Sequence, residues 1–336
     1  MVKQRLHNSL VEANPGSRDS SGSIHSPEVS VIIPAYNIAQ FIKETVESVL
    51  AQTFGNYEVI IVNDGSPDTA ELEKALRPYR EKINYVKQEN RGAGAARNAG
   101  LRLARGRYVA FLDGDDAWYP VFLEKQLELI NSDGGYDLVY ANALLDGDSP
   151  WAGKTYMDRD PSTGAATFEA LIAERCSPIT SGVLARLQPI LDVGLFDESL
   201  RNSQDFDLWV RLAKLRQARL GYQRTVLLKH RTRAGSLASD GIKSVEGELK
   251  VLKKIRSWPD LTASERTTLE ATFSLRSASI EVDRGKRSLL QGEFDAAAHS
   301  FRFANDYFRS WKLKLVIALL QVSPNFLRWC YKLRPL

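Results

Sequence analysis

Asp113, Asp115 and Asp116 lie within four residues of one another, directly after the apolar run 108–112. Carboxylates this close repel one another, and burial beside an apolar strand disfavours their charged forms. A hard divalent cation removes that conflict, since Mg²⁺ or Mn²⁺ typically takes one or two carboxylates together with the phosphate oxygens of a substrate. The same residues would also suit a polar turn that caps the next helix, because Asp is a favoured N-cap residue.

Two other apolar runs end in residues that can bind a ligand. Tyr36 and Asn37 follow the run at 29–33, and Asp64 follows the run at 58–62. An aromatic ring can stack on a nucleobase, and a carboxylate can accept its hydrogen bonds. A plain strand-to-helix turn with Gly65 at positive φ explains the second segment as well, and it is compatible with a ligand role for Asp64.

The segment 90–98 (NRGAGAARN) combines glycines with Arg91 and Arg97. It lacks the Gly-Lys-Ser/Thr of a P-loop, and Arg97 stands where a dinucleotide fingerprint has its third glycine. A Rossmann dehydrogenase is therefore disfavoured, and the lack of a Gly-x-Ser-x-Gly elbow disfavours an α/β-hydrolase. A helix that starts here would still attract phosphate through its free N–H groups.

A second acidic centre lies at 203–211 (SQDFDLWVR), where Asp205 stands at or near the start of a predicted helix. The helix dipole favours the ionised form of a carboxyl group in that position. Two interpretations remain open: an N-terminal cap with Asp207 as a charge of the first turn, or a general base.

These residues require a scaffold that brings the ends of several strands together. Apolar, β-branched runs alternate with segments of helical periodicity, which predicts an α/β fold built from βαβ units around a mostly parallel sheet. In such sheets ligands bind beyond the carboxyl ends of the strands, where the candidate residues fall. The expected strands cover 29–33, 58–62, 83–87, 108–112 and 136–142.

The remainder of the chain divides by composition. From 241 to 336 the pattern is helical, and 285–305 predicts a hairpin that turns at Gly292 and resembles one tetratricopeptide-type repeat. Residues 1–28, rich in Ser, Asn and charge, predict a disordered leader. Between these regions we expect loops over 145–175, a helix near 205–215 and a strand near 226–229.

Composition excludes several classes of protein. The 336 residues carry a formal net charge of +4 and contain only two cysteines, so neither a disulfide framework nor a cysteine-based zinc site is expected. A charge this small does not indicate a nucleic-acid partner. No signal peptide and no apolar run of about 20 residues is present, which predicts a cytoplasmic protein.

The positive charge is concentrated at the C-terminus. Residues 307–336 contain six Lys or Arg and no Asp or Glu, so the remaining residues sum to 4 − 6 = −2. Aromatic and aliphatic side chains lie between these cations. Two interpretations remain open: a helix on the anionic inner face of a membrane, or a helical hairpin whose apolar stripe packs on the α/β domain.

Taken together, the segments resemble the family 2 glycosyltransferases of the GT-A fold. Four pieces carry the resemblance in the family's usual order, and VGLFDESL (193–200) adds to it. The resemblance implies a GT-A domain over 29–240, followed by the helical region 241–336. The four pieces are VSVIIPAYN (29–37), EVIIVNDGSPDTA (58–70), NRGAGAARNAGLRLARGRYVAFLDGDDAW (90–118) and QDFDLWVRLA (204–213).

The resemblance also assigns roles to residues. Asp113 and Asp115 match the metal-binding Asp-x-Asp motif, which implies Mg²⁺ or Mn²⁺, and Asp205 matches the catalytic base. Gln204 stands where Glu is more usual, which keeps an acceptor oxygen but loses a charge. Arg231 and Arg233 lie in a basic loop, 230–236, that resembles one closing over the diphosphate. The implied donor-binding residues are Pro34, Tyr36, Asn37, Asp64, Arg91, Arg97, Asp113, Gln204, Arg211, Arg231 and Arg233.

The implied activity is inverting, metal-dependent transfer of a sugar to a hydroxyl group. The donor would be a UDP-, GDP- or dTDP-sugar, and the acceptor a glycan or a lipid-linked glycan of cell-envelope polysaccharide. A non-catalytic, sugar-nucleotide-binding or scaffolding subunit is the alternative, with the helical hairpin as its partner surface.

Overall fold

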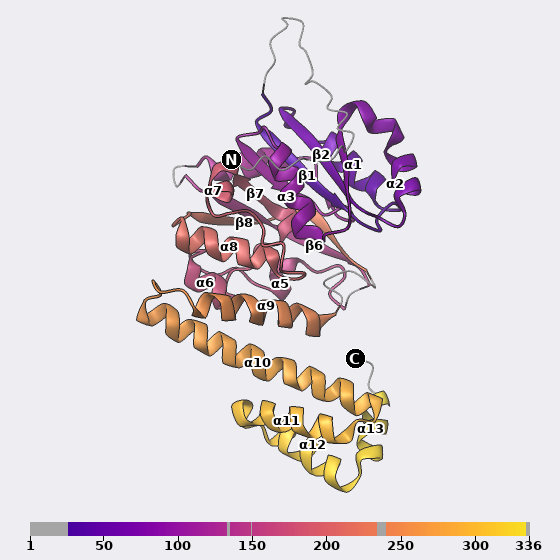
Figure 1. Cartoon of the computed structure of the whole chain (residues 1–336), viewed down its shortest axis with the longest axis vertical. Coiled ribbons are helices and arrows are strands. Elements are labelled where there is room, and N and C mark those ends of the chain that lie inside the picture. Colours follow the sequence, from indigo (N-terminus) through magenta and orange to yellow (C-terminus); the bar gives the residue numbers. More distant parts are fainter. Residues whose placement is uncertain (1–25, 133–134, 149, 234–239, 334–336) are drawn as a thin grey trace, which may run out of the picture. The chain divides into compact units, whose positions relative to one another are not determined.

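The computed structural model describes residues 26–132, 135–148, 150–233 and 240–333, so the expected leader lies almost wholly outside the described residues. The chain separates into two compact units, which divide between residues 236 and 237. We call the first unit 1 and the second unit 2 (Figure 1). Each unit is described by itself below.

Unit 1 is built on one eight-stranded sheet with the order β3-β2-β1-β4-β7-β6-β8-β5. Strands β1 to β4 pair in parallel, so the carboxyl ends of β1, β2 and β4 lie at one edge. The α/β fold expected from the sequence is therefore confirmed. The strands are β1 Val29–Ala35, β2 Tyr57–Asp64, β3 Asn84–Gln88, β4 Tyr108–Phe111, β5 Ala117–Trp118, β6 Leu138–Gly147, β7 Val183–Arg186 and β8 Leu220–Thr232.

The other half of the sheet is mixed. Strand β7 is antiparallel to both β4 and β6, and β5 is antiparallel to β8, whereas β6 and β8 run parallel. The sequence did not predict β5 or β7, because runs of two and four residues carry too little periodicity to stand out. Because β5 follows β4 along the chain and pairs with β8, the end of β8 lies next to the segment that follows β4.

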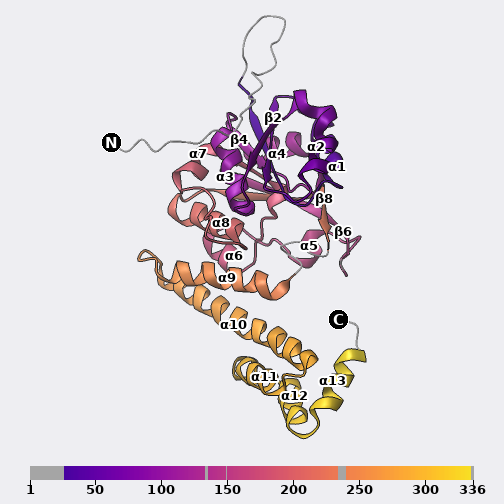
Figure 2. The same ribbon diagram turned by 45° about the vertical axis from the view of Figure 1, so that its right-hand side comes forward.

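Helices cover both faces of the sheet (Figures 1 and 2). On β2, Val59 and Ile61 belong to the main core, whereas Ile60 and Val62 pack on Ala96 of α3. Alternate side chains of one strand are thus buried on opposite faces, which explains its nearly continuous apolar run. The helices of unit 1 are α1 Ile42–Leu50, α2 Thr69–Leu76, α3 Ala93–Leu103, α4 Phe122–Ile130, α5 Tyr156–Arg159, α6 Phe168–Ile172, α7 Leu187–Asp192 and α8 Gln204–Leu215, with the 3₁₀ turns η1 Arg77–Lys82 and η2 Thr180–Gly182.

The expectation of loops over 145–175 was wrong in part. Two short helices, α5 and α6, lie there, and each starts at a Thr whose side chain accepts a hydrogen bond from the backbone of its first turn. Thr155 and Thr167 are these caps. Helices of only four and five residues, flanked by glycines and prolines, show too little periodicity to be predicted from the sequence.

Gly106 gives a stability prediction. A Cβ at this position would lie 2.6 Å from the Ser30 backbone N and 2.8 Å from the Tyr108 backbone O. Backbone atoms of β1 and β4 cannot move aside cheaply, so we expect Gly106→Ala to destabilise the protein by about 2 kcal/mol or more. Gly55→Ala is the matched control, because its Cβ would meet nothing within 4 Å. Urea unfolding of both variants tests this, and equal midpoints would contradict it.

Unit 2 is all helical. The expected turn is confirmed at Gly292, which adopts φ 89° at the end of α10, and α11 follows it. The last two helices, which cover residues 311–333, pack within unit 2, where their Leu320 and Leu327 join Leu289 and Phe301 in one hydrophobic cluster. No helix among the described residues is both long and apolar enough to cross a membrane. The helices are α9 Gly241–Arg256, α10 Ala263–Gln291, α11 Phe294–Phe308, α12 Trp311–Val322 and α13 Pro324–Leu333.

Candidate functional site

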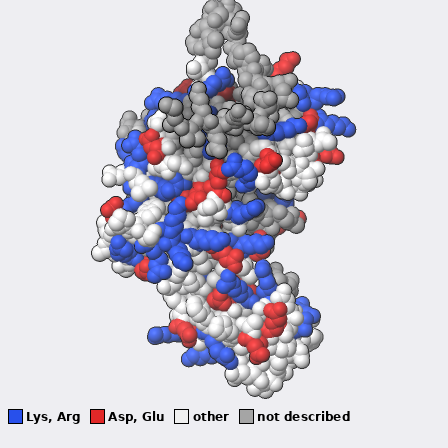
Figure 3. All heavy atoms as spheres, viewed as in Figure 1, with Lys and Arg blue, Asp and Glu red and all other residues white. Residues whose placement is uncertain are grey.

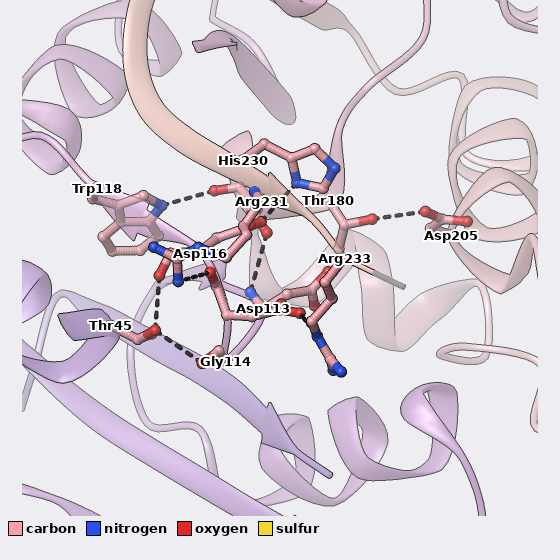
Figure 4. A network of polar contacts seen from close by, with 12 residues as sticks. Thr45, Asp113, Gly114, Asp116, Trp118, Thr180, Asp205, His230, Arg231 and Arg233 are labelled. Carbon is pink, nitrogen blue, oxygen red and sulfur yellow. Dashed lines mark hydrogen bonds and ion pairs between the residues drawn. The ribbon is translucent and has the colours of Figure 1, made fainter. Parts of the chain in front are cut away.

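The acidic segment after β4 forms a tight turn at the sheet edge (Figure 4). The Asp116 backbone N–H donates to the Asp113 carbonyl at 3.0 Å. The Thr45 hydroxyl of α1 lies 3.0 Å from the Gly114 carbonyl and 2.8 Å from the Asp116 carbonyl. A Cβ on Gly114 would lie 2.9 Å from Ile38 Cδ1 and 3.1 Å from the Pro34 carbonyl oxygen, so a larger residue between the two aspartates would require its neighbours to shift. The turn is therefore fixed from both sides by α1 and the segment after β1.

The end of β8 supplies cations to this turn. His230 Nδ1 lies 2.9 Å from one oxygen of Asp116, and the Arg231 backbone N–H donates to the other at 2.8 Å. Arg233 Nε donates to Asp115 Oδ2 at 2.6 Å. Figure 3 shows carboxylates gathered on one face of unit 1 with Lys and Arg around them. The predicted basic loop and the acidic turn thus meet, although Gly235 and Ser236 lie outside the described residues.

Burial and the charges of the acidic turn shift the pKa values of Asp115 and His230. Burial raises the pKa of the Asp115 carboxyl group, and the charge of neighbouring Asp116 raises it further. Burial alone would lower the pKa of His230, but the charge and the hydrogen bond of Asp116 together raise it to about 9. His230 is therefore protonated at neutral pH and offsets one of the carboxylates.

The turn η2 connects the acidic segment to Asp205. The Thr180 hydroxyl donates to Asp205 Oδ2 at 2.7 Å, and the Asp113 backbone N–H donates to the hydroxyl of adjacent Ser181 at 3.1 Å. Asp205 Oδ1 accepts the Phe206 N–H at the start of α8. Two adjacent residues thus place Asp205 on the same side of the sheet as the acidic turn (Figure 4). No local sequence pattern marks Thr180 or Ser181, so neither was predicted as a site residue.

Arg97 lies buried between the two acidic centres. Its Nη2 donates to Asp113 Oδ1 at 2.5 Å, and its guanidinium carbon lies 5.6 Å from the centre of the Phe196 ring. In the described part of the chain, Arg97 Nε and Nη1 and the buried Gln204 Oε1 have no hydrogen-bond partner. Gln204 lies against α3, because a Cβ on Gly94 would be 3.3 Å from its Cγ. Buried polar atoms without partners are costly and favour a ligand that completes them.

The segments after β1 and β2 support each other. Asn37 adopts φ 53°, and its N–H donates to the Ser66 hydroxyl at 2.6 Å. Tyr36 beside it is 47% exposed, so its ring is open to a ligand, and Pro34 lies within β1. The side chain of Asp64 is buried.

Asp64 holds the start of α3. Its two carboxylate oxygens accept the backbone N–H groups of Arg91 at 2.9 Å and Gly92 at 2.8 Å, and the Gln88 amide at 2.7 Å. The exposed side chain of Arg91 pairs with Glu198 at 2.5 Å. Hydrogen bonds from Asn98 and attraction to the nearby arginines lower the pKa of Glu198. Glu198 was not among the predicted site residues, although it lies in the segment 193–200 that carried part of the resemblance.

Arg211 differs from the sequence expectation. It is 7% exposed, and its three nitrogens donate to Asp207 and to the carbonyls of Val193 and Leu195 at 2.6–2.7 Å. Each nitrogen of the guanidinium is thus already engaged inside the protein. Arg211 supports the segment between α7 and α8 rather than offering donors to a diphosphate.

Arg211→Met should therefore affect stability rather than ligand binding. It leaves Asp207 buried without its cation, which costs about 3–5 kcal/mol in proteins. The double variant Asp207→Leu/Arg211→Met should recover part of that loss. Thermal unfolding and nucleotide titration measure the two effects separately. A tenfold weaker nucleotide affinity with an unchanged melting temperature would restore the donor-binding role.

Asp113 and Asp115 fit a divalent cation. No three His, Cys, Asp or Glu side chains converge as a metal cage in the ranges that the structure describes. Mg²⁺ commonly takes only one or two protein carboxylates and completes its shell with water and substrate phosphate. Burial and the charge of Asp116 raise the pKa of Asp115, so a bound cation would favour its charged form, and the side chains of Asp113 and Asp115 offer only carboxylate oxygens. Such a donor set suits Mg²⁺ or Mn²⁺.

Solved structures share this fold. Crystal structures of S. aureus TarS in complex with UDP and with UDP-GlcNAc are 20% identical in sequence, with a TM-score of 0.59 over 91% of this chain and 90% of theirs. The mannosyltransferase PcManGT from Pyrobaculum calidifontis, in complex with GDP-Man and Mn²⁺, is 16% identical, with a TM-score of 0.59 over 96% of this chain and 87% of its own. The fold is thus that of the GT-A glycosyltransferases.

Sequence comparison then gives the family. Residues 30–172 match the family model described as glycosyl transferase family 2. An uncharacterized glycosyltransferase of Rickettsia prowazekii (strain Madrid E) is 34% identical over 229 residues, which cover 67% of this chain and 70% of that protein. The chain belongs to glycosyltransferase family 2.

Other relatives match over a smaller share of their length. The putative teichuronic acid biosynthesis glycosyltransferase TuaG of Bacillus subtilis (strain 168) is 49% identical over 106 residues, 31% of this chain and 42% of TuaG. An uncharacterized glycosyltransferase of Rickettsia felis is 32% identical over 64% of this chain. The match spans only 36% of the R. felis protein and 30% of its Rickettsia bellii counterpart.

Proposed function

We propose that the chain transfers a sugar from a nucleotide-sugar donor to a hydroxyl group with inversion at the anomeric carbon. The observation that carries this proposal is the turn η2, whose residues Thr180 and Ser181 hydrogen-bond to Asp205 and to the backbone of Asp113. Because Thr180 and Ser181 are adjacent, the carboxylate of Asp205 and the acidic turn at Asp113 lie a short distance apart. That arrangement suits a reaction in which proton removal and leaving-group departure occur on one sugar.

Asp205 acts as the general base in this proposal. It accepts the proton of the acceptor hydroxyl as that oxygen attacks the anomeric carbon and the bond to the diphosphate breaks. The hydrogen bonds from the Thr180 hydroxyl and from the Phe206 N–H at the start of α8 orient the carboxylate. The site offers one base and no second nucleophile in the sequence pattern, so a single displacement with inversion is expected.

The diphosphate binds beside the acidic turn. A divalent cation held by Asp113 and Asp115 would neutralise charge that develops on the leaving diphosphate. Arg231 and Arg233 lie at the same place, and Arg97 has two unpartnered nitrogens that phosphate oxygens would satisfy. Gln204 Oε1, also unpartnered, can accept a hydrogen bond from a sugar hydroxyl.

The nucleobase lies at the ends of β1 and β2. The exposed Tyr36 ring provides a stacking surface, with Pro34 and Asn37 beside it. The Asp64 carboxylate accepts three hydrogen bonds within the protein, and its remaining lone pair is available to an N–H group of the nucleobase. Arg91 lies at the start of α3, close to where a phosphate would be received.

The relatives support a proposal for the substrate class. The donors bound by the structural neighbours are UDP-GlcNAc and GDP-Man, and TuaG is described as a putative glycosyltransferase of teichuronic acid biosynthesis. We propose a UDP-, GDP- or dTDP-sugar as donor and a glycan or lipid-linked glycan as acceptor, in the synthesis of cell-envelope polysaccharide at the cytoplasmic face.

Calorimetric titration with a panel of nucleotide sugars in the presence of Mn²⁺ tests the proposal. Binding of one donor, followed by its slow hydrolysis or transfer to a glycan, is the expected result. NMR of the product then reports the anomeric configuration, and retention would contradict the single displacement. Binding without turnover of any donor would favour the alternative of a non-catalytic, sugar-nucleotide-binding subunit.

A further inference from the structure

Helix α12 has apolar side chains on two opposite faces. One face packs inside unit 2, with Leu313, Val316, Ile317 and Leu320 in the cluster that also holds Leu289 and Phe301. An amphipathic helix that only covers a core carries polar residues on its other face. The other face of α12 departs from that rule and offers a surface to a second apolar partner.

The second face is an exposed apolar stripe. Trp311, Leu315 and Val322 are 69%, 52% and 85% exposed, and Ala318 between them is exposed as well. Successive positions of this stripe are four, three and four residues apart, so they lie on one side of the helix. Figure 3 shows uncharged surface over much of the end of unit 2 that carries α12.

Helix α13 repeats the arrangement. Phe326, Trp329 and Leu333 are each more than half exposed and lie three or four residues apart, whereas Leu327 is buried. The rings of Phe326 and Trp329 stack with their centres 5.9 Å apart. Two consecutive helices therefore each present one packed face and one exposed aromatic and aliphatic face.

The charged side chains that α12 and α13 themselves carry are all positive. Lys312 and Lys314 flank the α12 stripe, one on each side, and both are exposed. Arg309 and Lys332 add to them, and residues 307–336 contain no Asp or Glu. Long basic side chains beside an apolar stripe can extend to an anionic surface while the stripe enters an apolar layer.

We propose that the exposed faces of α12 and α13 form a docking surface for an anionic lipid membrane. Tryptophan favours the interface between headgroups and acyl chains, and the cations are attracted to anionic headgroups. A second copy of this chain fits less well. A two-fold contact would place identical patches together and oppose the cations of α12 and α13, two helices that carry no carboxylate of their own.

Vesicle co-sedimentation of the full chain tests the proposal. We expect at least ~10-fold tighter binding to phosphatidylcholine vesicles that contain phosphatidylglycerol than to phosphatidylcholine alone, with a steep loss as salt rises. Trp311→Ser/Leu315→Ser and Lys312→Gln/Lys314→Gln should each weaken binding at least ~10-fold. All four side chains are exposed, so the fold should persist, and circular dichroism checks it.

Matched variants control for composition. Trp151→Ser/Leu215→Ser removes the same two residue types from exposed positions of unit 1, and Lys250→Gln/Lys253→Gln removes two exposed lysines of α9. Both controls should bind vesicles like the unaltered chain. Equal binding to both kinds of vesicle, or full binding by Trp311→Ser/Leu315→Ser, would overturn the proposal. A dimer that this variant abolishes, without vesicle binding by the unaltered chain, would overturn it in favour of a second copy.

Discussion

Asp205→Asn is expected to lower the rate of sugar transfer by ~10²–10⁴-fold, the usual contribution of a general base. The amide cannot take a proton at neutral pH, but it keeps the shape of the carboxyl group and can still accept the Thr180 hydroxyl. Donor binding should therefore change by less than a few-fold. The rate with saturating donor and acceptor, together with the donor affinity by calorimetry, measures the two effects separately.

Two further variants sharpen this prediction. Asp192→Asn changes a carboxylate of unit 1 that pairs with Arg216 outside the site, so transfer should be unaffected. Thr180→Val retains Asp205 but removes its hydrogen bond, and it should give an intermediate loss with an altered pH profile. Undiminished transfer by Asp205→Asn would mean that another group takes the proton.

Asp115→Asn is expected to lower transfer by at least ~10²-fold and to abolish its dependence on Mn²⁺ or Mg²⁺. The substitution removes one of two carboxylates that fit the cation and also releases Arg233 from its partner. Calorimetric titration of Mn²⁺ in the presence of a nucleoside diphosphate should show weaker binding. Melting temperatures then establish that the variant is folded.

Asp146→Asn is the matched control for the metal. Asp146 lies in β6, and its carboxylate is 3.7 Å from Lys229 Nζ. We expect it to keep both transfer and Mn²⁺ affinity. If the unaltered chain works equally well in excess chelator, the cation has no part in the reaction, and Asp115 acts through Arg233 alone.

Strands whose side chains are buried on both faces of the sheet could be predicted from the sequence. Residues 29–33 and 58–62 are buried in unbroken runs, so hydrophobicity alone marks β1 and β2. The reversal of β7 between β4 and β6 was not predictable, because a strand of four residues gains its position from pairing partners distant in the sequence.

The site residues divide in a similar way. Asp113, Asp115 and Asp205 stand out by residue type at strand and helix ends. The residues that hold them in place do not stand out in the sequence. Thr180 and Ser181 make their hydrogen bonds to residues that are 25 and 68 positions away, and only the folded chain brings these residues together. Arg211 follows Asp207 by four residues, a spacing that favours a pair within one helix, and the structure contains that pair.

The contacts between the acidic turn and the end of β8 join residues 114 to 118 positions apart. A ribosome therefore makes the three aspartates many seconds before His230 and Arg233, at the usual rates of synthesis. Until β8 arrives, a nascent chain has Arg97 to pair with Asp113, but it lacks the cationic partners of Asp115 and Asp116. This cluster of charges is consequently among the last parts of unit 1 to be completed, and premature termination before residue 230 yields a chain that cannot assemble it.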